Sequence, residues 1–540
     1  MCEGQPKREP ERVDAVVVGA GLNGIYQLYS LVERGLSVRT FEAGEGVGGV
    51  WYWNRYPGAR CDSHFPFYQY WFSQALWDEA DWKERFPGQA DIEAYLNRVC
   101  DKFDLKRHIT FGALVTEARF DEETGRWLVT TDRGDRVSAQ FLVLSTGGLS
   151  VAAKPPFEGA ERFKGLSCHT SRWPREGVDM KGKRVGVVGT AATGIQVIQT
   201  IAPEVERLVV FQRTPNYAIS MRNDRIGPDD LAQMRAAYPE LLAGVRQSEG
   251  GFVYGGPPPP NFADLTPAER TAHLERIWAE GNLRLWGGSF ADAGDNPEAS
   301  EFVSDFVRGK IREKVKDPAV AEKLIPRDHA FASRRVPLEN GYFEAFNRDN
   351  VELVDLREDP IVSIDETGVN TASGRHHDLD VIVYATGFEA GVGAIRRIDI
   401  RGRGGVSLRE QWDKAVTTTV GMQVHGFPNL FMTMAPFAPA SALCNIPVCS
   451  DQQVQWITDT IAFVRDQGLR SIEPKAETEA AWMAHHQEVS EPTLIGRNRQ
   501  SWYRLPTGNR ELIAYLGGLN QYRATCEGYR ASGYAGFALT

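Results

Sequence analysis

Two segments of this 540-residue chain repeat one pattern, in which a short β-branched strand runs into a glycine-rich turn and then an amphipathic helix. The first spans residues 13–42 around the turn 19–24, and the second spans residues 183–212 around the turn 189–194. In both, a continuous apolar run gives way to helical spacing and then to a second strand, which predicts a βαβ unit. The chain is therefore expected to be an α/β protein with two doubly wound, Rossmann-like dinucleotide-binding domains.

A long middle segment, residues 217–330, departs from this alternation and has helical periodicity throughout. Thr266 and Glu269 have the spacing of a capping box, and Asn296 followed by Pro297 is typical of a helix start. The length also exceeds the usual size of one core, so two or three packed units are expected. We interpret the segment as a helical insertion in the second domain.

Composition excludes several classes of partner. The formal net charge is −10, so neither nucleic acid nor an anionic membrane is an expected partner. The first ten residues are polar and lack the apolar run of a secretory signal, and no later stretch has the length of a membrane span. We expect a cytoplasmic protein; its oligomeric state is left open, and a monomer is compatible with the sequence.

The seven cysteines are scattered and show neither CxxC nor metal-ligand spacing. This pattern predicts no disulfide framework and no metal site. Cys444 and Cys449 are the nearest pair, and we expect them to be buried free thiols.

The first glycine turn carries the full GxGxxG spacing, at Gly19, Gly21 and Gly24. Glu42 follows at the end of the next strand, where a carboxylate can accept hydrogen bonds from a ribose. The glycines let the backbone approach a pyrophosphate at a helix N-terminus. These four residues are expected to hold a dinucleotide, and an acid at this place suits FAD.

The second turn has Ala191 in the place of the middle glycine. Arg213 stands where an NAD site would carry an acid, and a guanidinium there can bind a 2′-phosphate, so NADPH is the expected coenzyme. The alternative for Arg213 is a solvated surface cation. The expected coenzyme contacts in this unit are Gly189, Thr190, Gly194, Arg213 and Thr214.

Two dinucleotide sites in one chain indicate electron transfer from NADPH to FAD. Dithiol reductases pass such electrons to a close cysteine pair near the flavin, and the N-terminal region has no such pair. Oxygen is therefore the expected acceptor.

Residues 163–174, FKGLSCHTSRWP, match the FxGxxxHxxxW[P/D] fingerprint of Baeyer-Villiger monooxygenases and lie just before the second glycine turn, as in that family. The fingerprint positions are Phe163, Gly165, His169 and Trp173. Trp173 separates the motif from those of the related flavin-containing and N-hydroxylating monooxygenases. Taken alone, His169 would be a structural histidine, whereas the resemblance implies a domain linker that couples coenzyme binding to motion.

The resemblance covers nearly the whole chain and is closest to the cyclohexanone, phenylacetone and steroid monooxygenases. Residues 48–62 look like the flavin-side loop of the family, and by this similarity Arg335 is the active-site arginine and Asp62 the carboxylate that orients it. A plain structural ion pair is the competing interpretation of these two residues. Further residues expected at the cofactors are Gly49, Trp51, Arg334 and Trp502, and those expected in the substrate loop are Phe437, Ser441, Ala442 and Leu443.

The resemblance implies a ketone substrate, which O2 and NADPH convert to an ester or lactone through a flavin C4a-peroxide, with thioether oxidation as a possible side activity. A monooxygenase acting on heteroatoms and an NADPH-dependent flavoprotein reductase are the alternatives. Departures from the family pattern fall at Ala191, His64, Arg334, and the segments 435–443 and 504–510, and they bear on substrate and coenzyme preference.

Strands ending in Thr-Gly at 146–147 and 386–387 indicate where the chain crosses between domains. The FAD domain is then built from both chain ends, with the NADP domain nested between them. The expected parts are residues 1–148 (FAD-binding, N-terminal part), 149–216 (NADP-binding, first part), 217–330 (helical insertion), 331–386 (NADP-binding, second part) and 387–540 (FAD-binding, C-terminal part).

Overall fold

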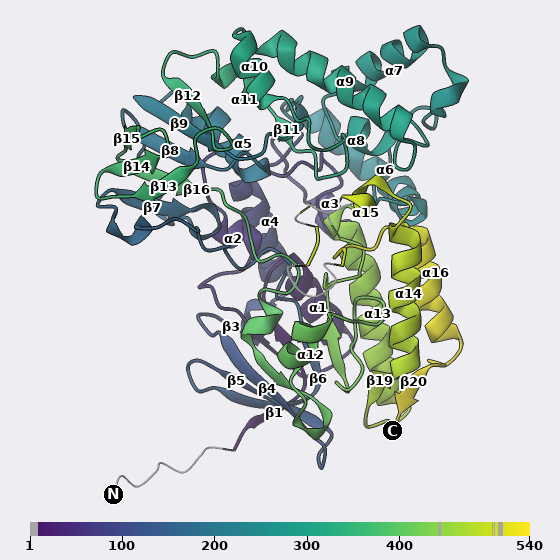
Figure 1. The fold of residues 1–540 in the computed structure, drawn as a ribbon. Coiled ribbons are helices and arrows are strands. Elements are labelled where there is room, and N and C mark those ends of the chain that lie inside the picture. Colours follow the sequence, from purple (N-terminus) through teal and green to yellow (C-terminus); the bar gives the residue numbers. More distant parts are fainter. Residues whose placement is uncertain (1–8, 441–443, 499–500, 502, 506–510) are drawn as a thin grey trace, which may run out of the picture.

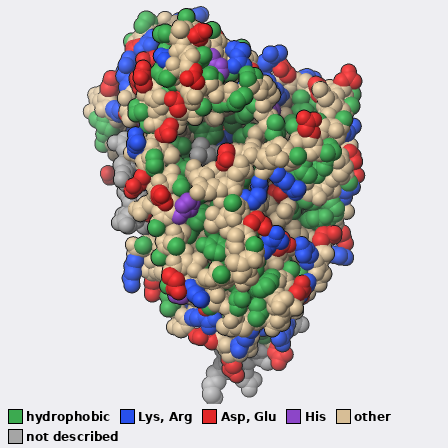
Figure 2. Space-filling view, turned by 90° about the vertical axis from the view of Figure 1, so that its right-hand side faces the viewer, with side chains coloured by type: hydrophobic (Ala, Val, Ile, Leu, Met, Phe, Trp, Pro, Cys, Tyr) green, Lys and Arg blue, Asp and Glu red, His purple; other side chains and the backbone are tan. Residues whose placement is uncertain are grey.

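The computed structural model describes residues 9–440, 444–498, 501, 503–505 and 511–540. Figure 1 shows two sheet-containing regions, with helices α9 and α10 along the top of the view, α7 and α8 to the right of the upper sheet, and the long C-terminal helices along one side. On the face shown in Figure 2, acidic and basic side chains are intermixed over the surface. Within the described part of the chain, no helix is both long enough and apolar enough to cross a bilayer.

The larger sheet combines strands from both halves of the chain. Its order is β17-β4-β5-β6-β1-β2-β3, and β18 pairs with β6. Strand β1 runs parallel to both β2 and β6, whereas β5 is antiparallel to β4 and β6. Its strands are β1 (Glu11–Val18), β2 (Val38–Phe41), β3 (Ile109–Thr110), β4 (Val115–Asp121), β5 (Arg126–Thr131), β6 (Arg136–Leu144), β17 (Asp399–Arg401) and β18 (Leu430–Met432).

The second sheet is entirely parallel, in the order β12-β9-β8-β16-β7. Its central strands are buried almost throughout, which explains their continuous β-branched sequence. Its strands are β7 (Leu166–His169), β8 (Arg184–Val188), β9 (Arg207–Gln212), β12 (Val351–Asp355) and β16 (Val381–Tyr384). A small antiparallel sheet is formed by β13 (Ile361–Ile364), β14 (Gly368–Thr371) and β15 (His376–Asp378).

Both predicted strand–turn–helix–strand units are confirmed. Helix α1 (Leu22–Glu33) joins β1 to β2 in the first sheet, and helix α5 (Ala192–Ile201) joins β8 to β9 in the second. Each helix begins directly after its glycine turn, because the turn brings the helix N-terminus against the end of the strand.

The middle segment is helical, as its periodicity predicts. The Thr266 hydroxyl accepts from the Glu269 backbone while the Glu269 carboxylate accepts from the Thr266 backbone, and the Asn296 side chain caps the next helix. The helices are α6 (Pro228–Gln247), α7 (Pro267–Ala279), α8 (Arg284–Gly288), α9 (Pro297–Lys314) and α10 (Pro318–Leu324).

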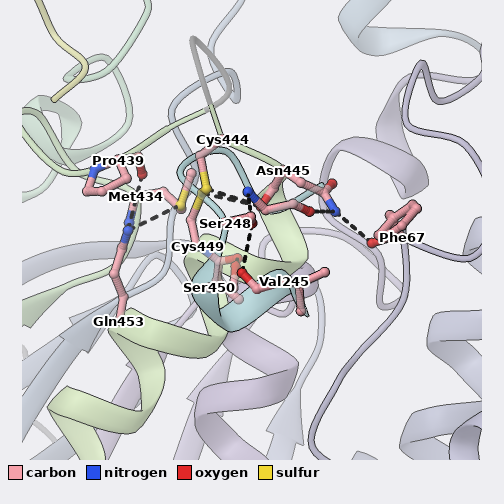
Figure 3. The surroundings of a disulfide bond; sticks show 12 residues. Phe67, Val245, Ser248, Met434, Pro439, Cys444, Asn445, Cys449, Ser450 and Gln453 are labelled. Carbon is pink, nitrogen blue, oxygen red and sulfur yellow. Dashed lines mark hydrogen bonds between the residues drawn. A yellow bond between two sulfur atoms is a disulfide. The ribbon is translucent and has the colours of Figure 1, made fainter. Parts of the chain in front are cut away.

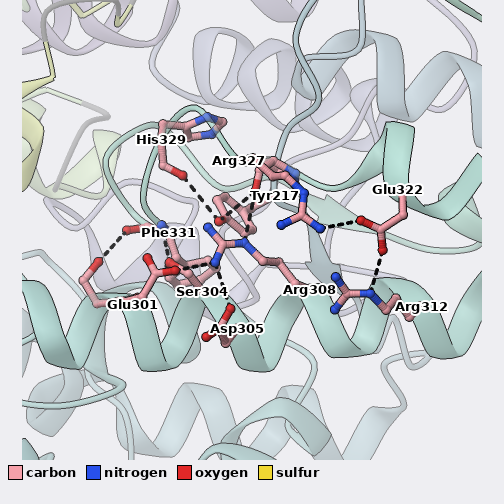
Figure 4. Close-up of polar contacts among 12 residues, drawn as sticks. Tyr217, Glu301, Ser304, Asp305, Arg308, Arg312, Glu322, Arg327, His329 and Phe331 are labelled. Atoms are coloured by element: carbon pink, nitrogen blue, oxygen red, sulfur yellow. Dashed lines mark hydrogen bonds and ion pairs between the residues drawn. The ribbon is translucent and has the colours of Figure 1, made fainter.

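Helix α9 holds the segment that leads to Arg334 and Arg335 (Figure 4). The Arg308 guanidinium donates to the Pro326 carbonyl at 3.1 Å and pairs with Asp305 at 2.9 Å. The Phe331 backbone donates to the Ser304 hydroxyl at 2.9 Å. These contacts between α9 and residues 326–331 fix the chain that leads to Arg334 and Arg335.

Helix α13 (Ile446–Asp466) packs on α1, and their polar contacts include Tyr26 to Asp451 at 2.7 Å and Gln27 to Thr458 at 3.0 Å. The remaining α-helices are α2 (Val50–Trp53), α3 (Gln74–Asp78), α4 (Gln89–Lys102), α11 (Tyr342–Ala345), α12 (Leu408–Lys414), α14 (Ala476–Ser490), α15 (Leu494–Arg497) and α16 (Leu519–Ala531). Two short strand pairs are β10 (Ile219–Ser220) with β11 (Leu338–Glu339), and β19 (Ile472–Pro474) with β20 (Phe537–Leu539). Short 3₁₀ turns lie at Lys106–His108, Ala160–Arg162, Thr170–Arg172, Phe262–Asp264, Ile395–Arg397 and Arg403–Gly405.

Candidate functional site

One cavity of about 630 Å³ joins the first glycine turn to the Arg335–Asp62 pair. Gly19, Gly21 and Glu42 line one part of it, and Asp62 and Arg335 line another. Ala192 and Gln196, from the helix of the second unit, also reach its wall. The cavity therefore adjoins both units that the sequence assigns to dinucleotides.

The first glycine turn has no room for a side chain at Gly19 or Gly24. A Cβ at Gly24 would lie 1.8 Å from the Gly19 carbonyl oxygen, and Gly19 itself has φ +103°. A Cβ at Gly21 would lie 3.3 Å from the Cα of Gly49, which also lines the cavity. Bare backbone thus faces the cavity at the N-terminus of α1, an arrangement that fits a pyrophosphate.

Glu42 lies at the end of β2 and is only 5% exposed. Burial raises the pKa of its carboxyl, while hydrogen bonds from the backbone N–H groups of Ala20 and Gly44, both at 2.7 Å, act in the opposite direction. These bonds fix the carboxylate in the cavity wall, where it can accept from a ribose hydroxyl.

The second turn repeats this backbone plan and is more open. A Cβ at Gly194 would lie 2.0 Å from the Gly189 carbonyl oxygen, whereas Ala191 has φ −83° and an exposed side chain. The Thr190 hydroxyl donates to the Thr214 carbonyl at 3.1 Å and so ties the turn to the end of β9. The methyl of Ala191 is accommodated because no strained φ is required there.

Arg213 and Arg334 provide two cations near this turn. Arg213 is exposed. Burial lowers the pKa of Arg334, the Asp328 carboxylate raises it, and the charge of Arg213 lowers it further, so the two guanidinium groups lie close enough to repel. The buried Nε of Arg334 has no hydrogen-bond partner among the described residues. Two like charges and a free donor are the features of an anion site.

Arg335 and Asp62 form a bidentate pair across 273 residues of sequence. Nε donates to Oδ2 at 3.1 Å, and Nη2 donates to Oδ1 at 2.7 Å. The side chain of Arg335 is 16% exposed and that of Asp62 is 25% exposed. Burial lowers the pKa of Arg335, but Asp62, Tyr503 and Cys61 together raise it by more, so the net shift is upward and the guanidinium stays charged.

The fingerprint residues lie where the chain crosses between the two sheets. His169 ends β7, and its Nδ1 accepts from the Ser171 backbone at 3.1 Å. Its Nε2 lies 3.3 Å from the hydroxyl of Thr386, which in turn donates to the Ala153 carbonyl at 3.4 Å. His169 therefore contacts the crossing segment around Thr386 directly. It contacts the other crossing segment, around Ala153, through Thr386.

The other fingerprint positions serve packing. A Cβ at Gly165 would lie 2.5 Å from the Asp380 carbonyl oxygen, so β7 can approach β16 only with glycine there. Trp173 is buried in the core of the second sheet, and Phe163 packs on the cluster at its other face.

Comparison with known proteins identifies the family of this chain. The family described as "Flavin-binding monooxygenase-like" matches residues 12–243. The acetone monooxygenase (methyl acetate-forming) of Gordonia sp. (strain TY-5) is 47% identical over 531 residues, covering 98% of this chain and 99% of that protein. A Baeyer-Villiger monooxygenase of Pseudooceanicola batsensis is 38% identical over 526 residues, covering 96% and 95%. This chain belongs to the Baeyer-Villiger monooxygenase family.

Solved structures support the same assignment for this Baeyer-Villiger family member. The structure of OTEMO in complex with FAD and NADP superimposes with a TM-score of 0.94 at 40% identity, covering 98% of this chain and 99% of that one. The α/β architecture with parallel and mixed sheets is thus that of the family.

Segment 48–62 of this Baeyer-Villiger monooxygenase, which resembles the flavin-side loop of the family, contributes residues to the cavity wall. Gly49 has φ +57°, and the indole N–H of Trp51 donates to the Tyr68 hydroxyl at 3.0 Å. Both residues and Tyr68 line the cavity.

The predicted substrate loop is placed only in part. Phe437 is fully buried with its ring against His486, and it is not among the cavity-lining residues. Its neighbours Ala435, Pro436 and Ala440 line the cavity instead. Ser441, Ala442, Leu443 and Trp502 lie outside the described residues.

His64 shows how the monooxygenase accommodates one departure from the family pattern. Its ring packs among Phe67, Phe86, Phe252 and Tyr254. Burial lowers its pKa to about 3, with a smaller contribution from Arg85, so the ring is neutral at physiological pH. A neutral histidine in an aromatic box needs no counter-ion.

The expectation of free thiols at Cys444 and Cys449 is wrong, because the two form a disulfide (Figure 3). Cys444 precedes α13 and Cys449 lies in its first turns, which brings their Cα atoms to 6.3 Å, within disulfide reach. Asn445 holds this segment by donating from its backbone to the Gly250 carbonyl at 2.8 Å and from its amide to the Phe67 carbonyl at 2.7 Å. Cys444 lines the cavity.

Sequence reasoning missed further residues in the cavity wall. Arg172 lies with its guanidinium 4.0 Å from the ring centre of Trp53, and both line the cavity with Tyr68 and Tyr503. Arg172 belongs to the fingerprint segment and Tyr503 follows Trp502, so position within a motif was the available signal. Tyr68 had none.

Proposed function

We propose that this chain converts a ketone to an ester or lactone, with FAD as bound cofactor and NADPH and O2 as co-substrates. The observation that carries the proposal is the Arg335 guanidinium, fixed by Asp62 in the wall of the cavity that reaches the first glycine turn. The net reaction is ketone + O2 + NADPH + H⁺ → ester + H2O + NADP⁺.

The two glycine turns divide the cofactors. When bound, FAD supplies the activation of O2, and NADPH supplies the hydride that reduces FAD. The residues proposed to hold FAD are Gly19, Gly21, Gly24, Glu42, Gly49, Trp51 and Asp62, with Trp502 as a further candidate. Those proposed to hold NADPH are Gly189, Thr190, Gly194, Arg213, Thr214 and Arg334.

Arg335 acts in this scheme as a fixed positive charge. Negative charge grows on the ketone oxygen when its carbon is attacked, and a preoriented cation in a water-poor wall stabilises that charge without reorganising. Asp62 holds two of the guanidinium N–H groups in one plane, which limits rotation of the side chain. Arg335 itself lines the cavity, so its charge acts on a ligand bound there.

Part of the cavity wall is apolar and suits an uncharged ketone. Ala435, Pro436, Ala440 and Ile446 line it. We include small thioethers among the expected substrates, because they fit the same apolar wall.

We further propose two doubly wound dinucleotide-binding domains with the boundaries expected from the sequence. Support comes from β17 and β18, which join the first sheet from the C-terminal half, and from β12 and β16, which complete the second. The proposed parts are residues 1–148 and 387–540 for FAD, 149–216 and 331–386 for NADP, and 217–330 as the helical insertion.

The deciding experiment supplies ¹⁸O2, FAD and NADPH with linear and cyclic ketones and analyses the products by mass spectrometry. One ¹⁸O atom in an ester or lactone supports the proposal. An amine or sulfide oxidised in place of ketones supports heteroatom oxygenation, and NADPH consumption without ¹⁸O incorporation supports a reductase.

Arg335→Ala should lower ester formation by about a hundredfold or more, because loss of a fixed charge-stabilising donor has effects of this size. FAD binding and NADPH oxidation should persist. The matched control is Arg34→Ala, which removes a surface guanidinium paired with Asp459 at 2.7 Å. Ester formation by Arg335→Ala at the parent rate contradicts the assigned role.

A further inference from the structure

The guanidinium of Arg335 has a second support besides Asp62. Its Cζ lies 4.6 Å from the ring centre of Trp286, in helix α8 of the insertion. This distance is within the range of a cation–π contact, in which the negative face of the ring attracts the cation. Asp62 thus binds one edge of the guanidinium, and the guanidinium carbon lies over the indole ring.

The contacts of helix α8 fix the position of this ring. Leu283 and Leu285 are buried in the core of the insertion, at 2% and 1% exposure. The Asn282 side chain accepts from the Arg284 backbone at 2.8 Å, and the Arg284 guanidinium pairs with Glu280 at 2.9 Å. The chain that leads to Trp286 is therefore fixed.

The surroundings strengthen the contact. Tyr254 and Tyr503 interact electrostatically with Arg335, and burial raises the pKa of each phenol, so both are uncharged. The Arg335 side chain is 16% exposed, and removal from water increases the energy of a cation–π contact relative to an exposed one.

Trp286 does not line the cavity, whereas Arg335 and Asp62 do. The contact with Arg335 is therefore a route by which the indole can affect a substrate in the cavity. The contact with the indole ring restrains the guanidinium in addition to its two hydrogen bonds to Asp62.

We propose that Trp286 is a positioning residue for Arg335, through which the helical insertion sets the orientation of the active-site cation. The proposal rests on the function proposed above. Its consequence is that Trp286 controls the amount of ester formed per NADPH consumed. Trp286 does not control which ketones enter the cavity.

The kinetic test compares Trp286→Leu, Trp286→Phe and Trp278→Leu in the FAD-loaded enzyme. Trp286→Leu should lower the ester formed per NADPH consumed by about tenfold, because the ring face is lost. Trp286→Phe should retain most of it, and the ratio of rates for small and large ketones should stay unchanged in both. Trp278, which packs on Phe306 in the same insertion, is the matched control and should behave as the parent.

A second measurement does not depend on activity. In protein labelled with ¹⁵N-arginine, the Arg335 side-chain N–H signal, assigned with Arg335→Lys, should carry a ring-current shift that disappears in Trp286→Leu and persists in Trp278→Leu. An unchanged Arg335 signal in Trp286→Leu overturns the proposal, as does an unchanged ester yield per NADPH. A parent enzyme that makes no ester overturns the proposed function instead, and the ring-current shift then still reports whether Trp286 covers Arg335.

Discussion

The two glycine-turn units have the same backbone plan and opposite surroundings. In the first, the Glu42 carboxylate is buried and hydrogen-bonded to backbone N–H groups around its own turn. In the second, Arg213 is exposed and Arg334 lies near it. On the proposed division of the cofactors, the turn places the pyrophosphate, while the residue after the next strand selects the dinucleotide.

This difference is the one expected between a cofactor that stays bound and a coenzyme that exchanges with solvent. A buried acid in a cavity wall suits a ligand that stays bound through turnover, whereas an exposed cation can attract a phosphate that arrives from solvent. We infer that the first unit retains FAD and the second exchanges NADPH.

The largest expected effect comes from a methyl group in the first turn. Gly24→Ala places a Cβ 1.8 Å from the Gly19 carbonyl oxygen, so strand and helix must separate and FAD should be lost. Gly194→Ala, with its contact of 2.0 Å to the Gly189 oxygen, should instead retain FAD and lose NADPH binding. FAD absorbance per protein and NADPH titration check both variants.

Gly309→Ala is the control for these substitutions, because a Cβ there meets no atom within 4 Å and the position is helical. If Gly194→Ala also expelled FAD, the two units would not be independent, and the comparison would fail.

Arg213→Ala should raise the KM for NADPH by about tenfold to a hundredfold and leave that for NADH unchanged, since only NADPH carries the phosphate that a charged donor would bind. Steady-state kinetics with both coenzymes measure the effect. Arg207→Ala, at the other end of β9 and paired with Glu352, is the control. Equal changes for NADPH and NADH would remove the phosphate assignment.

The smallest effect is expected for Ala191→Gly, which restores the glycine spacing of the first unit in the second. Loss of the exposed methyl should lower the KM for NADPH by about twofold to fivefold, because the backbone can approach the pyrophosphate more closely. FAD content should not change. A KM equal to that of the parent would show that this methyl does not face the coenzyme.

Local sequence signals were sufficient where local interactions decide the structure. The strands and helices of both units follow from periodicity and glycine spacing, and the caps at Thr266 and Asn296 follow from side chains that bond within three residues. The Arg335–Asp62 pair joins residues 273 positions apart, so no local pattern encodes it and only the family resemblance indicated it.

The disulfide and Trp286 could not be predicted either. Cys444 and Cys449 are five residues apart at the start of α13, a spacing that matched no disulfide or metal-ligand pattern, and Asn445 between them is held by Phe67 and Gly250, which are distant in sequence. Trp286 reaches Arg335 because α8 packs in the insertion core, and a tryptophan in a helical segment is more often a packing residue.

The first sheet has a consequence for synthesis on the ribosome. Strand β18 pairs with β6, so this sheet stays incomplete until residue 432 has been made, long after its first strands have emerged. The second sheet needs nothing beyond β16, which ends at Tyr384. Because domains generally fold as units during translation, the region encoded in the middle of the gene is expected to fold before the one encoded at its start.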